Sequence, residues 1–368
     1  QGDFWWGLSV TTSMAIVALA APPMGAIADH AGVRKRFMGL LTCMSVAATA
    51  LMATVGKGDV IWGWFLAVVG TVGFEAAIVC YNAYLPELVP RDRQGRLSAY
   101  GFAVGYLGSA VALGAALPFA LRGSYAGAFL TTAALFGLFS IPAFIYLPGD
   151  RSATLTLSGA VRVGFTQTQA TLRRILALPD LRRFLLAYLF FEDGINTVVF
   201  FSSIFAGHTL GFTTPEVIKL YLVVQLSALL GAWVWARPTD LRGPKVVVQC
   251  TLVQWCAIVV GVYFVQTKPQ FFVAAIAAGT GLGAVQAASR TFMATLIPRG
   301  HEAELFGFYA LCGKTAAIFG PMIFGLASIL TGGNQRIAIA AIGLFFLAGL
   351  LVISGVKAGG PTARQPEL

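Results

Sequence analysis

Four ionisable side chains lie inside long apolar runs of the sequence: Glu75, Asp193, Arg290 and Lys314. A charged group at the centre of a bilayer costs roughly 2.5–3.5 kcal/mol by insertion scales, so each one needs a partner or a function. Asp193 is followed by Gly194, which allows close approach of a ligand or a helix. A partly buried carboxyl group can exchange protons near neutral pH, so Asp193 or Glu75 is predicted to bind a proton or a ligand ammonium group. The alternative is a permanent ion pair with Arg290 or Lys314.

Other polar groups in the same runs suit ligand binding. Arg290 is the preferred partner for a ligand carboxylate, because the guanidinium fork donates two parallel hydrogen bonds, and Lys314 is the second candidate. Snorkelling of Arg290 to lipid phosphates is the structural alternative. Glu192 is adjacent to Asp193 and therefore about 100° around the helix, so it is predicted to face a neighbouring helix or an interface. The remaining polar candidates are Asn82, Asn196 and Gln286.

The composition around these residues is that of a membrane protein. Of the 368 residues, 57% are AVILMFWYC and 11% are charged, and the mean hydropathy is +0.79. A soluble protein has about 25% charged residues, so a soluble enzyme, a disordered chain and a nucleic-acid-binding protein are excluded. The five cysteines lie in apolar runs without CxxC spacing, and no nucleotide, metal or nucleophile motif is present, so no disulfide, metal, cofactor or enzymatic activity is predicted.

Eleven apolar segments are long enough to cross a bilayer, which takes about 20 residues each. They lie at 4–28, 37–55, 60–85, 97–120, 125–147, 183–206, 215–236, 246–266, 269–297, 304–329 and 333–355. Five apolar side chains of segment 161–178 share roughly one helical face, which predicts an interfacial amphipathic helix in the connector 148–182. They are Val161, Phe165, Leu172, Ile175 and Leu176.

The positive charges predict the orientation. Of the 25 Lys and Arg residues, 18 lie in the loops and the tail of one side, and 4 lie in the loops of the other side. Because cytoplasmic loops carry an excess of Lys and Arg, the first side is predicted to be cytoplasmic. The C-terminal tail, 357–368, is on that side.

Two pairs of segments indicate an internal duplication. Residues 88–105 align without gaps with residues 296–313, and Asp29-x-x-Gly32-x-Arg34 matches Asp240-x-x-Gly243-x-Lys245. The first pair is offset by 208 residues and the second by 211. Asn82 and Arg290 occupy equivalent positions in this repeat, so we expect both to face one pseudo-symmetric vestibule.

The duplication also predicts a further helix. The partner of segment 183–206 would precede residue 1, and the chain begins with Gln1 rather than Met. We therefore expect a 6+6 arrangement whose first helix is missing from this chain, with 11 transmembrane helices visible. The predicted fold is an all-α, two-half helix bundle of the membrane. Its parts are an N-terminal half, 1–147, a cytoplasmic connector, 148–182, a C-terminal half, 183–356, and a cytoplasmic tail, 357–368.

Parallel halves of six helices are the architecture of the major facilitator superfamily. The loop Gly25-Ala-Ile-Ala-Asp29-His-Ala-Gly32-Val-Arg34-Lys35-Arg36 resembles the superfamily's signature between its second and third helices, and Arg237-Pro-Thr-Asp240-Leu-Arg-Gly243-Pro-Lys245 is a degenerate second copy. The resemblance implies a cytoplasmic gate, in which a carboxylate meets a neighbouring helix N-terminus in one state and releases it in the other. The gate residues are Asp29, Gly32, Arg34, Lys35, Asp240 and Gly243. A basic loop that only sets the topology is the alternative.

A closer resemblance covers most of the chain. The segments that carry it include Tyr81-Asn82-Ala83-Tyr84-Leu85-Pro86-Glu87, Glu192-Asp193-Gly194-Ile195-Asn196-Thr197, Gln286-Ala-Ala-Ser289-Arg290 and Glu304-Leu-Phe306-Gly307-Phe308-Tyr309. They are similar to the vacuole-effluxer (autophagy-related) branch of the superfamily and its bacterial relatives. The resemblance implies that the third, sixth and ninth visible spans, which carry Glu75, Asp193 and Arg290, line a central cavity.

From this resemblance we expect a secondary active transporter that works by alternating access, is coupled to protons and effluxes neutral amino acids. Sugars, organic acids and drugs are alternative solutes, and a non-transporting sensor that keeps the fold is the alternative from a different class. The expected partners are the solute, protons and the lipid bilayer, and the chain is expected to act as a monomer. The expected location is a bacterial inner (plasma) membrane.

Overall fold

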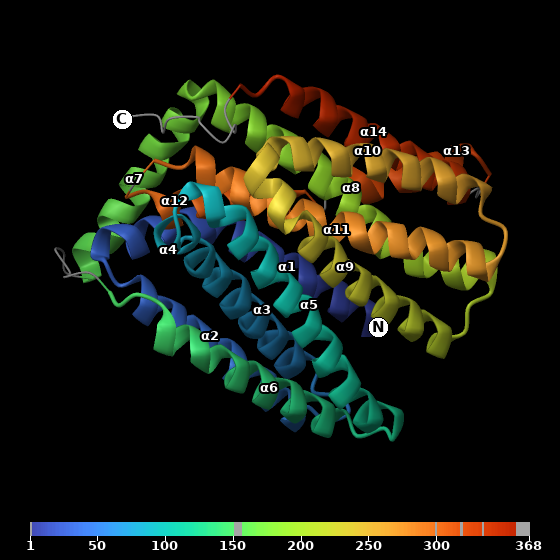
Figure 1. Cartoon of the computed structure of the whole chain (residues 1–368). Helices are drawn as coiled ribbons and strands as arrows, with labels where there is room; N and C mark the ends of the chain where they lie inside the picture. Colours follow the sequence, from blue (N-terminus) through green and yellow to red (C-terminus); the bar gives the residue numbers. More distant parts are fainter. Residues whose placement is uncertain (1, 151–156, 299, 317–318, 333–334, 358–368) are drawn as a thin grey trace. The chain divides into compact units, whose positions relative to one another are not determined.

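The structure is a computed structural model that describes residues 2–150, 157–298, 300–316, 319–332 and 335–357. Every regular element in these ranges is helical, as a lipid-embedded backbone requires (Figure 1). The helices are α1 (Gly2–Ala31), α2 (Arg34–Leu51), α3 (Val60–Asn82), α4 (Leu85–Leu88), α5 (Arg91–Leu121), α6 (Tyr125–Tyr146), α7 (Leu157–Ala177), α8 (Pro179–Leu210), α9 (Thr214–Arg242), α10 (Pro244–Phe264), α11 (Lys268–Leu296), α12 (Glu302–Thr315), α13 (Phe319–Leu330) and α14 (Gln335–Ser354). A 3-10 turn, Met52–Thr54, follows α2.

In the described part of the chain, ten helices are long and apolar enough to cross a membrane. The expectation of eleven is not confirmed, because the described residues of the predicted span 304–329 form α12 and α13, and residues 317–318 between them lie outside the described residues. The missing first helix stays a prediction.

The residues form two compact units that differ from the two sequence halves. One unit comprises Gln1–Tyr84, Val111–Arg174 and Ile297–Lys314, and the other comprises Leu85–Ala110, Ile175–Leu296 and Thr315–Leu368. Each unit therefore contains helices from before and after the connector. The division of the duplicated sequence at 147 and 183 stays a prediction.

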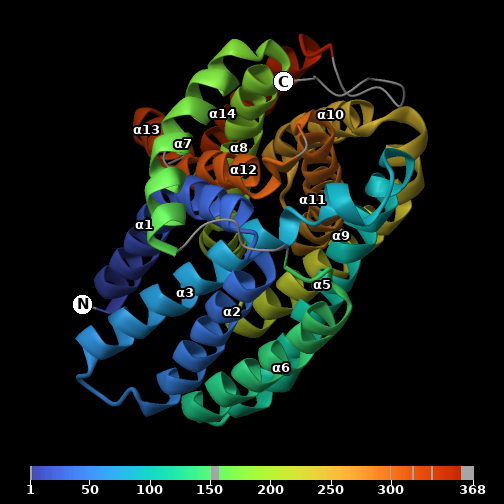
Figure 2. The ribbon, with the colours of Figure 1, turned by 90° about the vertical axis from the view of Figure 1, so that its left-hand side faces the viewer.

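The first unit is built around α2. Helix α2 lies between α3 and α6 in both ribbon views (Figures 1 and 2). Close approach of α2 and α3 depends on Gly73, where a Cβ atom would lie 2.8 Å from the carbonyl oxygen of Leu41. The Ser45 hydroxyl donates to the carbonyl of Gly70 at 2.7 Å and joins the same two helices. Helix α1 packs on α3 and also contacts α12.

The second unit is built around α9 and α11, which lie side by side (Figure 1). A Cβ atom on Gly283 would overlap the carbonyl oxygen of Ala228, and one on Gly279 would lie 2.6 Å from that of Val224. Small residues thus let the two backbones approach, as is typical of membrane helices. Helix α14 packs against α8 and α10 in the same unit.

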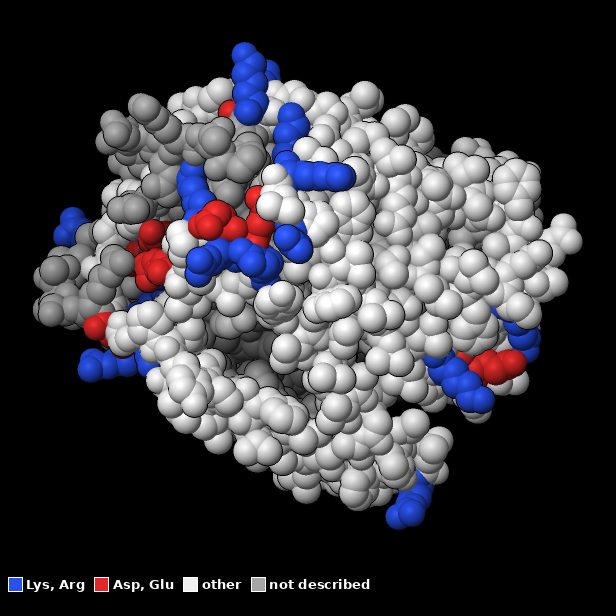
Figure 3. Space-filling model, viewed as in Figure 1, with Lys and Arg blue, Asp and Glu red and all other residues white. Residues whose placement is uncertain are grey.

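The connector contains a helix. Helix α7 spans Leu157–Ala177, and of the five predicted apolar positions Ile175 is buried while Leu172 and Leu176 are exposed. Val161 and Phe165 lie in this helix, but their side chains are outside the described residues. On the face shown in Figure 3, charged side chains gather in a few groups and most of the surface is uncharged. An uncharged surface of this kind suits the apolar core of a bilayer.

Candidate functional site

Asp29, in the last turn of α1, holds the start of α12. Its Oδ2 atom accepts a hydrogen bond from the backbone N–H of Glu304 at 3.0 Å, and its Oδ1 atom accepts one from Arg34 at 2.6 Å. Arg34 also donates to the carbonyl of Ala83 at 3.2 Å and to Glu302 Oε2 at 3.4 Å. The first amides of a helix have no acceptor in their own helix, so Asp29 supplies one. We call the bond from the Glu304 amide to Asp29 the α12 contact.

Glycines allow this contact to form. A Cβ atom on Gly25 would overlap the carbonyl of Ala303, and one on Gly307 would overlap the carbonyl of Ala21. The backbones of α1 and α12 therefore touch directly. Gly32 ends α1 with φ 64°, a left-handed conformation that favours glycine.

A second aspartate forms a similar contact in the other unit. Asp240, near the end of α9, accepts a hydrogen bond from the backbone N–H of Gly95 at 2.7 Å and one from Arg96 Nε at 2.6 Å. Both partners lie in the second turn of α5. Gly243, with φ 86°, follows α9 and begins α10. We call the bond from the Gly95 amide to Asp240 the α5 contact.

Side chains of α8 and α11 form a buried polar pair. The Gln286 amide nitrogen donates to both carboxylate oxygens of Glu192 at 3.0 Å each. Glu192 is 9% exposed. Asn196 is half-buried one turn further along α8, on the side of the helix that carries Glu192.

Arg290 lies one turn from Gln286 and contacts α5. Its Nε donates to the Ser98 hydroxyl at 2.8 Å and its Nη2 donates to the Ser98 carbonyl at 2.6 Å. The guanidinium stands 4.4 Å from the centre of the Phe102 ring. Tyr106 stacks on Phe102 and lies within electrostatic range of Glu192 and Arg290. Glu192, Gln286, Arg290, Ser98, Phe102 and Tyr106 are called the polar cluster below.

Asp193, in α8, is fully buried and lies beside the first residues of α13. Its Oδ1 atom accepts a hydrogen bond from the backbone N–H of Gly320 at 2.9 Å. A Cβ atom on Gly320 would overlap the Thr197 hydroxyl and would lie 2.7 Å from Asp193 Oδ1. Only glycine therefore fits at position 320, beside Asp193 and Thr197.

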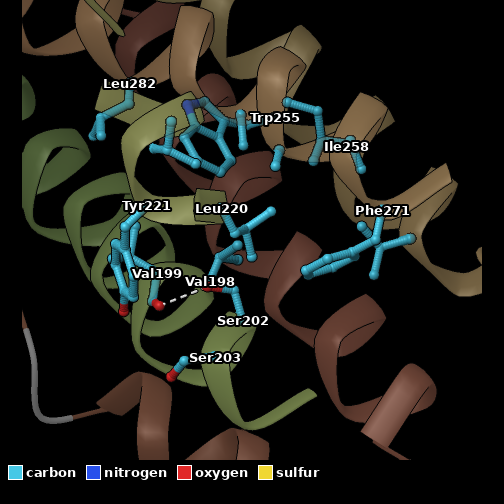
Figure 4. A pocket seen from close by; sticks show the side chains of 15 residues that line it. Val198, Val199, Ser202, Ser203, Leu220, Tyr221, Trp255, Ile258, Phe271 and Leu282 are labelled. Atoms are coloured by element: carbon cyan, nitrogen blue, oxygen red, sulfur yellow. Dashed lines mark hydrogen bonds between the residues drawn. The ribbon is translucent and has the colours of Figure 1, made fainter. Parts of the chain in front are cut away.

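A cavity of about 70 Å³ lies among α8, α9, α10 and α11 (Figure 4). Val199, Leu220, Trp255 and Phe271 surround it, and the Ser202 hydroxyl at its edge donates to the Val199 carbonyl at 2.8 Å. This lining offers apolar surface and no charged side chain, so it does not suit a charged solute.

Comparison with known proteins decides the family. Residues 8–360 match the family model described as vacuole effluxer Atg22 like. The chain belongs to this family. The MFS-type transporter YxiO of Bacillus subtilis is 29% identical over 367 residues, which cover 97% of this Atg22-like chain and 85% of YxiO. Autophagy-related protein 22 of Cryptococcus neoformans is 29% identical over 286 residues, which cover 70% of this chain and 48% of that protein, so the match spans about half the length of the fungal relative.

Solved structures show the fold. The proton:xylose symporter XylE, of the major facilitator superfamily, superposes with a TM-score of 0.75 at 13% identity, covering 96% of the Atg22-like chain and 86% of XylE. The relatives and structural neighbours are transporters of this superfamily and not enzymes. The Atg22-like chain is thus a multi-pass membrane protein of the major facilitator transporter type.

Four other candidates named from the sequence, Glu75, Lys314, Lys35 and Asn82, belong to the first unit. Glu75 accepts a hydrogen bond from Lys314 Nζ at 2.5 Å, so these two candidates form an ion pair. Lys35 contacts residues at the start of the connector and just before it. Its backbone N–H donates to Asp150 Oδ1, and its Nζ donates to the carbonyl of Leu147. Asn82 is half-buried at the end of α3.

Sequence reasoning missed several partners in this Atg22-like chain. The prediction that Glu192 faces a neighbouring helix or an interface is confirmed by its bond to Gln286 of α11, whereas Ser98, Phe102, Arg96, Glu302 and Glu304 received no role. The predicted repeat could have indicated some of these partners, because its offset of 208 residues aligns Arg96 with Glu304. Since Asp29 and Asp240 are also equivalent in the repeat, a partner found for one of them predicts the partner of the other.

Proposed function

We propose that this protein is a secondary active transporter that moves a small solute by alternating access. Its family and fold support transport. The α12 contact joins a helix of the N-terminal sequence half to one of the C-terminal half, and so does the α5 contact. Both lie at helix ends on the side that the charges of the loops predict to be cytoplasmic. Their formation corresponds to a state closed toward the cytoplasm, and their release to an open state.

The polar cluster is the proposed solute-binding wall. It combines a carboxylate, Glu192, with a guanidinium, Arg290, and the aromatic faces of Phe102 and Tyr106. Groups of opposite charge suit a zwitterion, and the aromatic faces suit its apolar side chain. Neutral amino acids are the solutes that meet both requirements, and their export is the proposed direction.

Asp193 is the proposed coupling residue, and its full burial is the observation that carries the proposal. Ionisable residues inside membrane segments are costly and are typical of proton pathways in transporters. Ionised Asp193 accepts the Gly320 amide bond and stabilises the start of α13. Proton binding removes the charge and weakens this hold, which links proton uptake to movement of α13.

The test uses the full-length protein in proteoliposomes with a labelled mixture of neutral amino acids. In Asp193→Asn the amide oxygen still accepts the Gly320 bond while the charge is lost. We expect gradient-driven accumulation to fall at least tenfold in this variant, while exchange without a pH gradient continues. Glu75→Gln serves as the matched control and retains gradient-driven flux.

Three outcomes would change the proposal. Equal gradient-driven flux in wild type and Asp193→Asn removes Asp193 as the coupling residue. Loss of driven flux in Glu75→Gln alone transfers the role to Glu75. Absence of amino-acid exchange in the wild type overturns the solute assignment in favour of sugars, organic acids or drugs.

The protein is proposed to work as a monomer in a bacterial plasma membrane, with its C-terminus in the cytoplasm. The distribution of Lys and Arg supports this orientation. In the proposed cycle, the half 1–147 rocks against the half 183–356 about a site at mid-membrane, and the connector tethers the two halves.

A further inference from the structure

A groove of about 310 Å³ lies on the last turns of α9, in the second unit. Two arginines, Arg237 and Arg242, line it together with apolar side chains, which are Val234, Trp235, Pro238 and Leu241. Helix α9 is one of the helices that are long and apolar enough to cross a membrane, and this candidate span ends at Arg242. The groove therefore lies at the end of the span, where the chain leaves the apolar core of the bilayer.

The two arginines lie at opposite edges of this groove. Successive residues of an α-helix are about 100° apart around its axis, so Leu241, Val234 and Pro238 lie between Arg237 on one edge and Arg242 on the other. Both arginines are exposed, and so are Val234 and Leu241. The groove thus offers a guanidinium group at each edge and hydrocarbon surface between them.

The positive charge of the groove is not compensated by the acidic residue of the same helix end. Asp240 is buried, and it accepts bonds from the Gly95 amide and from Arg96 Nε on α5. Among the residues that the structure describes, none forms an ion pair with Arg237 or Arg242. The groove therefore has a net positive charge, which an anionic ligand would compensate.

An exposed apolar stripe continues from the groove along α9. Leu226, Leu230 and Val234 follow one another at intervals of four residues, and their side chains are between 50% and 58% exposed. Side chains at this spacing lie on the same side of a helix, and these three extend over about 12 Å of its axis. One leaflet of a bilayer contains about 15 Å of hydrocarbon. The stripe thus gives an acyl chain a contact surface of nearly leaflet depth beside the arginines.

We propose that this groove binds one anionic phospholipid. The guanidinium forks of Arg237 and Arg242 donate paired hydrogen bonds to the phosphate, and an acyl chain lies along the stripe of Leu226, Leu230 and Val234. A headgroup that also carries a cation is repelled by the two arginines, so an anionic headgroup is preferred. This helix end lies on the side predicted to be cytoplasmic, where anionic lipids attract basic groups. Binding requires neither a solute nor a proton gradient, so it is separate from the proposed transport.

The test measures lipid binding to the full-length protein by native mass spectrometry. Dioleoyl phosphatidylglycerol, which is anionic, is titrated into the protein in detergent, and the dissociation constant of the first bound lipid is determined. Dioleoyl phosphatidylcholine, which has the same chains and a zwitterionic headgroup, is titrated in parallel. One arginine near an anionic headgroup changes the affinity about fivefold, so we expect phosphatidylglycerol to bind to the wild type at least fivefold more tightly than phosphatidylcholine.

Variants of the groove separate its charges from its apolar surface. Arg237→Gln and Arg242→Gln should each weaken phosphatidylglycerol binding about fivefold, and the double variant about 25-fold. Arg93→Gln combined with Arg122→Gln removes the same two charges near the ends of α5 and should retain the wild-type affinity. Val234→Ser reduces contact with the acyl chain and leaves both arginines, so it should weaken the two lipids by the same factor.

Equal affinity of the wild type for the two lipids overturns the proposal and needs no variant. Full phosphatidylglycerol affinity in the double variant of Arg237 and Arg242 overturns it as well, and so does an equal loss in the α5 control, which would indicate an effect of net charge alone. Glycerol phosphate, the headgroup anion without chains, should not displace the bound lipid at equal concentration. Displacement would indicate a site for a free anion and would reject the lipid. Lipid binding without amino-acid flux would reject only the proposed function.

Discussion

The α12 contact and the α5 contact involve aspartates of two matching sequence segments, and they differ in their surroundings. Asp29 is almost fully buried, its Arg34 partner is 10% exposed, and two glutamates and a histidine lie beside the pair. Asp240 is also buried, but its Arg96 partner is 43% exposed. Burial strengthens electrostatic interactions and raises the cost of leaving a charge unpaired.

Both contacts have a carboxylate bonded to a backbone amide near the start of a helix. The α5 contact combines this bond with one partly exposed ion pair. The α12 contact combines it with a buried ion pair and a second buried carboxylate, Glu302. Three comparisons between the contacts, in order of expected effect, test this difference.

Replacement of the arginine, Arg34 or Arg96, should give the largest difference in stability between the two contacts. Arg34→Ala leaves buried carboxylates without their cation and should lower the free energy of unfolding by about 3–5 kcal/mol. Arg96→Ala removes a partly exposed pair and should cost at most about 1 kcal/mol. Thermal unfolding in detergent compares the two, with Arg93→Ala, an exposed residue beside Asp92, as the control. Equal losses for Arg34→Ala and Arg96→Ala would remove burial as the distinction.

A methyl group at the glycines should have the next largest effect. In Gly25→Ala the new Cβ overlaps the backbone of Ala303, which cannot move aside, and protection of the Glu304 amide against hydrogen exchange, measured by mass spectrometry, should fall roughly 5- to 150-fold. In Gly95→Ala the new Cβ lies 2.6 Å from Asp240 Oδ1 and 2.8 Å from a Thr239 methyl, and both side chains can shift. The loss of amide protection should therefore be smaller in Gly95→Ala than in Gly25→Ala. A larger loss in Gly95→Ala would contradict this expectation.

Salt should have the smallest effect. At about 1 M salt the screening length falls to about 3 Å, so the contribution of the exposed Arg96 should largely disappear, while that of the buried Arg34 should mostly persist. The measurement repeats the unfolding experiments on Arg34→Ala and Arg96→Ala at low and high salt. If Arg34→Ala no longer lowers the free energy of unfolding at high salt, the Arg34–Asp29 pair behaves as a solvent-exposed pair.

The helices were predictable from the sequence because lipid allows few alternatives. Apolar runs such as 60–85 and 125–147 match α3, Val60–Asn82, and α6, Tyr125–Tyr146, since a segment without water must satisfy its backbone by forming a helix. Segment 304–329 was predicted as one span, and its described residues form α12 and α13 on either side of residues 317–318, which lie outside the described residues.

The candidate site was predictable only in part. Buried charge identified Glu75, Asp193, Arg290 and Lys314, since an ionisable residue in lipid is conspicuous in any sequence. Their partners depend on which helix faces which, and spacing along the chain carries no such information. Glu192 was expected to face a neighbouring helix or an interface, which its bond with α11 confirms, but only the packing identifies Gln286 as the partner.

We propose that the α12 contact and the α5 contact open together. Each contact joins the two sequence halves, so separation of the halves must break both. The most direct test measures exchange of the Glu304 amide in Asp240→Ala, with Asp92→Ala as the exposed control. If the gate is shared, weakening the α5 contact lowers protection of the Glu304 amide about tenfold. Unchanged protection in Asp240→Ala would show that the contacts open independently and would contradict alternating access through a common gate.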